Sequence, residues 1–359
     1  MNNNTYSYEK LELVRLLRQK TQKEVAQAVG ITQSSLSKAE HGLYVMPAED
    51  LDKLCHYYDV PLDFFTSSDV ILPTGHFYYR RRLTIPNKTI DSFIAKVQIF
   101  KAIIDNLMKA VDLPDYTFES YKPDIENLSP KEIAQKIRYS LGVLRGPVPN
   151  LSTLLENNGI IIIGFDFGTE KIDGVTAVTN ENRKLMFINN RMPNDRIRFS
   201  VAHELGHLVM HVPYPPIDIE VAEQQADEFA SEFLMPENEI RPMLSGLSFQ
   251  TLSILKKRWR VSMHALVRRA KDLGVISYQQ YRSIQMYFSK KGFTKSEPFP
   301  LPVEKPTMLE EVLKLYSDVL GYSDKDMMNI MHIHQNDYIR WFNKRPKIIP
   351  ISIKTLYDK

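Results

Sequence analysis

The segment from Arg198 to His211 constrains this chain more than any other, because it contains the pattern His-Glu-x-x-His. Side chains four residues apart on an α-helix lie on nearly the same face, so His203 and His207 can direct two imidazoles at one point. Glu204 lies one step further round the helix, where its carboxylate can hold a water molecule on the same metal ion. The pattern therefore predicts a zinc site with His203 and His207 as ligands and Glu204 as the catalytic general base.

A catalytic zinc ion needs a third protein ligand and an open position for water. His211 continues the same helix face, but it lies about 12 Å along the axis from His203, which is too far for one straight helix to supply all three ligands. The longer metzincin pattern would need glycine and histidine where this chain has Met210 and Pro213. The third ligand is therefore expected further along the chain.

A second helix is expected between Glu220 and Met235, where alanine, phenylalanine and leucine recur at helical spacing. Glu223 and Asp227 are four residues apart on one face of this helix. Glu223 is the better candidate for the third zinc ligand, and Glu220, which lies near the same face, stays open as an alternative. Asp227 can accept the free imidazole N–H of a zinc-bound histidine, the usual role of a carboxylate behind such a ligand.

These motifs resemble the ImmA/IrrE family of bacterial metallo-endopeptidases. The resemblance rests on Ala-His-Glu-Leu-Gly-His-Leu-Val-x-His and on a later Glu-x-x-Ala-Asp-x-Phe-Ala stretch that ends in Leu-Met-Pro, and it covers roughly residues 141–280. It implies that His203, His207 and a glutamate of the second helix, here Glu223, bind Zn²⁺. It also implies that Glu204 is the catalytic acid and base.

Three short apolar runs precede the histidine motif and predict strands at residues 159–165, 173–178 and 184–189. Zincin sites commonly have a small sheet beside the metal helix, and its edge strand can align a peptide by β-augmentation. An ordinary α+β core predicts the same strands, so they do not decide between the two. The expected fold is mainly α with a small β-sheet, in the α+β class.

Residues from about 7 to 66 predict a bundle of short helices. Thr21 and Glu24 form a capping box for one of them, and Gly30 supplies the turn that ends it. Thr32 then caps the next helix. The segment 21–42 resembles the lambda-repressor-like (XRE) family of helix-turn-helix DNA-binding domains, which implies that the second helix of the pair enters the major groove.

The outward face of this second helix carries the side chains expected to contact DNA. Gln33, Ser34 and Ser37 are the candidates for reading base edges, and Gln22 and Lys38 are the candidates for contacting phosphates. A solvated face on a protein-binding bundle is the alternative. Acidic residues slightly outnumber basic ones here, although phosphate neutralisation supplies much of the affinity for DNA. Dimerisation on paired half-sites is expected to compensate for the weak affinity of a single domain.

Composition and the N-terminal sequence indicate where in the cell the protein is expected. No run of about 18 apolar residues occurs, and the N-terminus lacks the basic and apolar regions of a secretory signal, so we expect neither export nor membrane insertion. Cys55 is the only cysteine and cannot form a disulfide within one chain, which fits a cytoplasmic location. The net charge of +3 says little about partners.

Four parts are expected along the chain. Residues 1–68 form the helix-turn-helix domain, 69–125 a linker and connecting helix, 126–295 the zincin-like metallopeptidase domain, and 296–359 a small helical appendage. In the second part, an amphipathic stripe predicts a helix over 90–111. In the fourth, the proline-rich stretch 296–306 predicts a linker, and helices are expected at 308–320 and 324–341.

Two classes of function fit these parts. The first is a DNA-binding regulator with an active zinc endopeptidase. Proteases of the resembling family often cleave repressors in response to stress, so a repressor or the chain itself is the expected substrate, with self-cleavage between Val70 and Pro86. The second is a non-catalytic repressor or antitoxin whose zincin-like domain is a sensor or dimerisation module. The first is favoured because all four expected hydrophilic groups are retained, and such groups are costly to bury without a purpose.

Overall fold

The computed structural model describes residues 6–67, 85–215 and 218–342 of the chain. The segment considered for self-cleavage lies outside these residues, except for its last two positions. Contacts group the chain into two compact units. The first joins Met1–Asp69 to Tyr322–Lys359, and the second is Val70–Gly321. Among the described residues, no helix is both long and apolar enough to cross a membrane.

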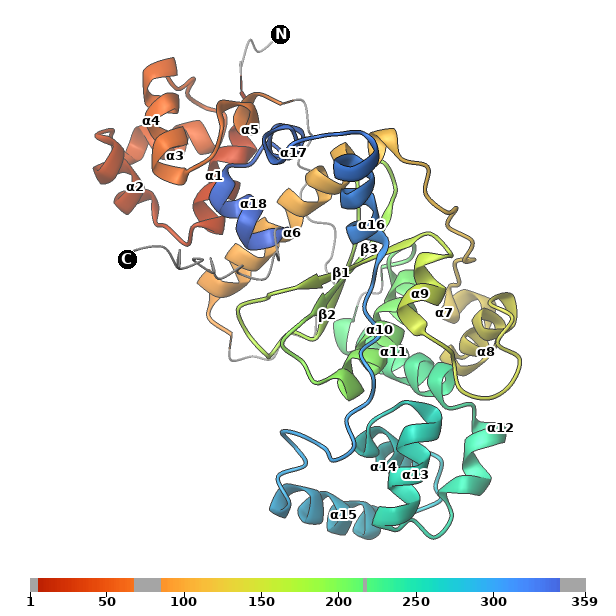
Figure 1. Ribbon diagram of the computed structural model, residues 1–359. Helices are drawn as coiled ribbons and strands as arrows, with labels where there is room; N and C mark the ends of the chain where they lie inside the picture. The colour runs from red at the N-terminus through yellow and green to blue at the C-terminus, as the bar shows by residue number, and fades with distance from the viewer. Residues whose placement is uncertain (1–5, 68–84, 216–217, 343–359) are drawn as a thin grey trace, which may run out of the picture. The chain divides into compact units, whose positions relative to one another are not determined.

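All regular secondary structure in the described residues of the first unit is helical (Figure 1). Thr21 and Glu24 make the expected capping box, and Gly30 ends the helix in the left-handed conformation with φ of 80°. Thr32 caps the following helix, so the expected helix-turn-helix pair is confirmed. The helices are α1 (Tyr8–Leu17), α2 (Gln22–Val29), α3 (Gln33–Glu40), α4 (Ala48–Tyr58), α5 (Leu62–Thr66), α17 (Asp324–Met331) and α18 (Gln335–Trp341).

The second unit combines a small sheet with many helices, which is the expected α+β class (Figure 1). The three predicted strands are present as β1 (Ile160–Phe165), β2 (Gly174–Val178) and β3 (Lys184–Asn189). The helices are α6 (Asn87–Leu107), α7 (Pro123–Glu126), α8 (Pro130–Ser140), α9 (Leu151–Glu156), α10 (Asn194–Gly206), α11 (Ile219–Leu234), α12 (Glu237–Ile240), α13 (Phe249–Trp259), α14 (Met263–Asp272), α15 (Tyr278–Lys290) and α16 (Met308–Lys314). Short 3-10 or π segments are η1 (Met108–Ala110), η2 (His207–His211), η3 (Arg241–Leu244) and η4 (Leu315–Val319).

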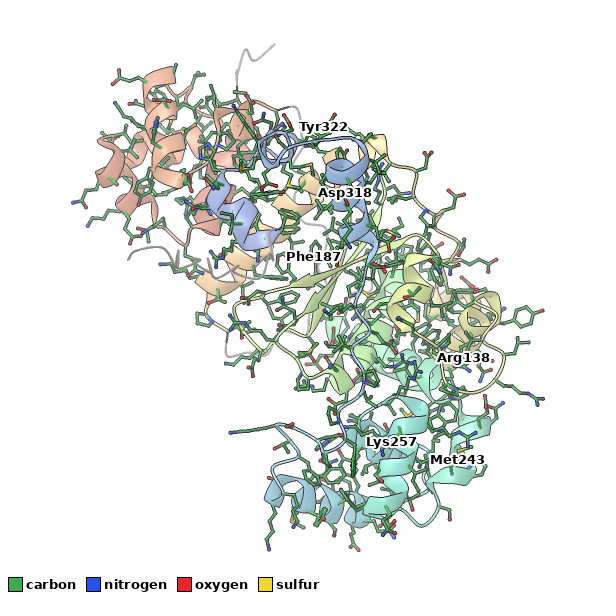
Figure 2. The ribbon with its side chains drawn as sticks, viewed as in Figure 1. Arg138, Phe187, Met243, Lys257, Asp318 and Tyr322 are labelled. Atoms are coloured by element: carbon green, nitrogen blue, oxygen red, sulfur yellow. The ribbon has the colours of Figure 1, made fainter. Side chains whose placement is uncertain are left out.

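The sheet has the order β1-β3-β2, with β1 parallel and β2 antiparallel to β3. Successive side chains of a strand point to opposite faces. On one face, Phe187 of β3 (Figure 2) lies 5.1 Å from Phe165 and 6.2 Å from Phe100 of α6, measured between ring centroids. On the other, Met186 and Ile188 belong to the large core that includes α10 and α11. The sheet therefore separates α6 from the helix that carries the histidine motif.

α11 packs between two helices, and this packing sets the orientation of its acidic face. It makes most of its contacts with α10 and α8. Arg138 of α8 (Figure 2) donates hydrogen bonds of 2.7 Å to the carbonyls of Phe233 and Gly146. Gly206 lets α10 approach closely, because a Cβ there would lie 3.1 Å from the ring of Phe229 and 3.3 Å from Cα of Ala226.

The C-terminal part departs from the sequence expectation at one point. The helix expected over 324–341 is two helices, because His332 adopts the left-handed conformation with φ of 52° and ends α17. The linker expected at 296–306 forms no helix or strand, as predicted. It is nevertheless fixed in the second unit, since Glu304 pairs with the buried Arg198 and Glu297 with the buried Lys256. The four-part division of the chain stays a prediction.

Candidate metal centre

α10 brings the two motif histidines together as predicted. The Nε2 atoms of His203 and His207 lie 3.0 Å apart, and the ring of His207 is fully buried. After Gly206 the helix continues as the π-type segment η2, in which the backbone N–H of Val212 bonds to the carbonyl of His207. His207 thus stands at the junction of an α-helix and a wider turn, a feature found often at functional sites.

α11 supplies the third group. One carboxylate oxygen of Glu223 lies 3.5 Å from His203 Nε2 and the other 3.3 Å from His207 Nε2. The candidate ligand atoms of these three residues all lie within 4.8 Å of one another. Glu220, the alternative, is exposed and does not belong to the cluster.

The chemistry of this cluster fits a zinc ion. Two imidazole nitrogens and one carboxylate oxygen are a common ligand set of catalytic zinc. In addition, Glu223 Oε1 is buried without a hydrogen-bond partner among the described residues. A buried carboxylate oxygen in that state is costly unless a cation balances it. We call His203, His207 and Glu223 the His-His-Glu cluster.

Hydrogen bonds behind the cluster set the tautomers of both histidines. His203 Nδ1 donates to Asp227 Oδ1 at 2.9 Å, and the role of Asp227 behind a zinc ligand stays a prediction. His207 Nδ1 lies 2.8 Å from Nδ1 of His211, and His211 Nε2 lies 2.9 Å from Oε1 of Gln225. Because the amide oxygen of Gln225 only accepts, His211 donates to it and accepts from His207. Both Nε2 atoms of the cluster can then present lone pairs to a metal.

Glu204 lies beside the cluster and is held by β2. The Thr176 hydroxyl donates to Glu204 Oε2 at 2.7 Å and also lies 3.2 Å from the backbone carbonyl of Glu204. Gly174 leaves room for the carboxyl group, because a Cβ there would lie 2.9 Å from Oε1. Sequence reasoning missed Thr176, Gly174 and Gln225. The expected small sheet beside the metal helix was the hint that this segment would lie next to α10.

The electrostatics of the site follow from burial and pairing. Burial raises the pKa of Glu204 to about 8 and lowers the pKa of His207 to about 3. For His203, burial acts to lower the pKa, but the neighbouring carboxylates of Asp227 and Glu223 outweigh it and raise the pKa to about 10. For Glu223, burial acts to raise the pKa, but the neighbouring imidazoles of His203 and His207 hold it far below its ordinary value. The site therefore favours a positive charge between the carboxylates of Glu223 and Asp227.

A cleft of about 680 Å³ adjoins the site. Residues of α10, α11, α14 and α15 line it, together with the segment from Phe293 to Glu297. Asp227 faces both the cleft and the His-His-Glu cluster, and Asp173 lines the cleft next to β2. The walls mix aromatic rings, such as Phe199 and Tyr281, with charged groups, a lining suited to the side chains and polar backbone of a peptide.

The residues expected to contact DNA lie in the first unit. Gln33, Ser34 and Lys38 of α3 are exposed, and Ser37 is half-buried. Gln22 differs from the others, because its amide nitrogen donates to Glu40 Oε2 at 2.7 Å. The roles assigned to these five residues stay predictions.

Comparison with models of protein families agrees with these two regions. Residues 155–271 match the family described as the IrrE N-terminal-like domain, and this match contains β1 to β3, α10 and α11. Residues 11–65 match a helix-turn-helix family. A comparison with curated proteins found no match. Both resemblances read from the sequence are thus confirmed, and the chain carries an XRE-type helix-turn-helix region followed by an IrrE/ImmA-like region of the metallopeptidase kind.

Proposed function

We propose that the chain is a DNA-binding regulator with a zinc-dependent endopeptidase, which cleaves a transcriptional repressor or a similar protein. The observation that carries the proposal is the convergence of His203, His207 and Glu223 within 4.8 Å, with Glu204 alongside. Four hydrophilic groups from two helices gather here in a mostly buried position. Burying these groups together costs free energy unless they hold a cation.

Each residue then has a defined task. His203, His207 and Glu223 would hold the zinc ion, which polarises a scissile carbonyl and lowers the pKa of a bound water toward about 7. Glu204 accepts the proton of the attacking water at its free carboxylate oxygen and passes it to the leaving amine nitrogen. Thr176 keeps the other oxygen of Glu204 in place. Asp227 and His211 keep the two imidazoles in the tautomer that ligation requires.

The substrate would lie along β2 and in the adjoining cleft. In the described sheet β2 pairs with β3 on one side only, so its other edge can add a peptide strand. Glu204 is hydrogen-bonded to Thr176 in the middle of β2, so a peptide paired with this strand passes beside Glu204. The cleft would then receive side chains of the substrate.

The helix-turn-helix region would bring this activity to DNA-bound proteins. α3 would enter the major groove as part of a dimer, with Gln33, Ser34 and Ser37 at base edges and Lys38 at a phosphate. One N–H of the Gln22 amide donates to Glu40, and the second N–H would contact the phosphate. Selection of bound duplexes from random DNA tests this part. Gln33→Ala should lower the affinity for the selected sequence more than the affinity for a random sequence.

A proteolysis assay tests the enzyme. The full chain and its Glu204→Gln variant are loaded with zinc and incubated with candidate repressors from the same genome, and the products are read by intact mass. We expect cleavage by the wild type alone, at one bond of one repressor. Equal zinc in both proteins without cleavage of any candidate would instead support a non-catalytic sensor.

A further inference from the structure

The C-terminal helices belong to the helix-turn-helix unit, although about 250 residues of the second unit separate them from it in sequence. Arg18, at the end of α1, makes a two-pronged ion pair with Asp337 of α18, with Nη1–Oδ1 and Nη2–Oδ2 distances of 3.0 and 2.6 Å. Asp337 is only 4% exposed. Paired geometry of this kind is the strongest form of arginine–carboxylate contact.

A second polar contact lies at the end of α4. Asp59 ends α4 in the left-handed conformation. Its two carboxylate oxygens accept hydrogen bonds from His334 Nδ1 at 2.9 Å and from Asn336 Nδ2 at 2.7 Å. Arg18 also donates to the carbonyls of Tyr58 and Asp59, so the two contacts share one corner of the bundle.

Apolar burial supports the same grouping. Met327, Met331, Ile333 and Tyr338 are each less than a tenth exposed. Two helices of eight and seven residues are too small to bury these side chains between themselves. Their burial therefore depends on packing against other parts of the chain.

We propose that residues 322–342, called here the C-terminal clamp, attach the helix-turn-helix region to the rest of the chain at a second, non-covalent point. The covalent point is the segment 68–84. The clamp contacts the ends of α1 and α4, and none of its hydrogen bonds and ion pairs described above involves α3. These contacts lie at the ends of α1 and α4, whereas the face proposed for DNA is on α3.

This attachment changes the outcome of self-cleavage, and that consequence rests on the proposed function. A cut between residues 70 and 86 would leave the helix-turn-helix region bound through the clamp. Release from the peptidase would require a second event that opens the contacts of Asp337 and Asp59. A nicked chain could thus remain a single DNA-binding particle.

The clamp is tested with an introduced cut, which needs no activity of the chain itself. A recognition sequence for a site-specific protease is inserted after Thr74 in the Glu204→Gln background, and the cut chain is examined by size-exclusion chromatography at micromolar concentration. We expect the two pieces to elute together. Asp337→Ala should weaken their association roughly 100-fold or more, because it leaves the Arg18 charge unpaired while residues 1–69 stay unchanged.

Glu49→Ala is the matched control, since Glu49 forms an exposed ion pair with Lys53 on the outside of α4. It should leave the association unchanged. A chain that ends at Gly321 should separate completely after the cut, and circular dichroism verifies that each variant is folded. Separation of the unmodified pieces would overturn the proposal. Joint elution that neither Asp337→Ala nor the truncation weakens would overturn it as well.

Discussion

The Thr176 hydroxyl donates a 2.7 Å hydrogen bond to the Oε2 atom of Glu204. This contact joins β2, where a substrate strand is proposed to pair, to the residue proposed as general base. Both side chains are buried, so water does not compete for the bond. The position of the base is therefore set by the sheet as much as by its own helix.

Loss of this hydroxyl should slow catalysis without removing the metal. Thr176→Val keeps the shape of the side chain but frees the Glu204 carboxylate. We expect kcat to fall roughly 10- to 100-fold, since a hydrogen bond to a charged group contributes about 1.5–3 kcal/mol. Zinc content measured by elemental analysis should stay unchanged. Thr176→Ser, which restores the hydroxyl, should recover most of the activity, and a Ser variant as slow as the Val variant would refute this role.

A single methyl group at Gly174 should displace the same carboxylate. In Gly174→Ala the new Cβ would lie 2.8 Å from Cγ and 2.9 Å from Oε1 of Glu204, so the side chain must move. A misplacement of about 1 Å can cost roughly 100-fold in rate, and we expect a loss of that size in single-turnover cleavage. Gly164→Ala in β1 is the control, because its nearest neighbour atom is 4.0 Å away. Equal activity of both variants would contradict this prediction.

The chain of hydrogen bonds behind His207 should govern metal affinity. His211→Phe removes the acceptor for His207 Nδ1, and Gln225→Leu removes the acceptor for His211. Losses of such supporting contacts typically weaken metal binding by about 10- to 100-fold. Competition with a chromophoric chelator measures the zinc dissociation constant directly. Gln224→Leu, an exposed neighbour on α11, should bind zinc like the wild type, and a shift as large as that of Gln225→Leu would argue against a specific relay.

A buried charge network predicts acid sensitivity of the second unit. Lys256 is fully buried and lies 2.8 Å from carboxylate oxygens of both Asp195 and Glu297. For Glu297, burial acts to raise the pKa, but hydrogen bonds from His264, Lys256 and two backbone N–H groups outweigh it and lower the pKa from 4.5 to about 2. A carboxyl group with a lowered pKa stabilises the fold above its unfolded-state value, and this contribution is lost as the pH falls from about 4.5 to about 2.

Urea unfolding between pH 6 and pH 3 measures this effect. The free energy of unfolding of the wild type should fall with decreasing pH by on the order of 1–3 kcal/mol more than that of Glu297→Gln. Glu310→Gln, which alters an exposed pair with Lys314, should keep the wild-type pH dependence. Parallel curves for the wild type and Glu297→Gln would mean that Glu297 contributes no such stability.

Local patterns allowed much of this structure to be anticipated. The spacing of His203 and His207, the acidic face of α11 and the capping box at Thr21 all depend on residues close together in sequence, and the structure contains each of them. Gly174, Thr176 and Gln225 could not be found in this way, because they meet the site only when β2 and α11 pack against α10.

The helix break and the ion pairs of the C-terminal part could not be predicted from local patterns either. A histidine in the left-handed conformation leaves no pattern as clear as glycine does, so the break at His332 was not anticipated. The contacts of Arg18 with Asp337, and of Arg198 with Glu304, join residues more than 100 positions apart. Composition predicts a linker and an appendage there, but charge pairing over such separations depends on the folded chain.

Zinc content of two single-residue variants tests the central claim most directly. Glu223 and Glu220 lie on the same helix, and only Glu223 is part of the His-His-Glu cluster. Elemental analysis of purified full-length protein should find one zinc per chain in the wild type and in Glu220→Ala, and a small fraction of that in Glu223→Ala. Absence of zinc from the wild type, or loss of zinc in Glu220→Ala with retention in Glu223→Ala, would contradict the proposed metal centre.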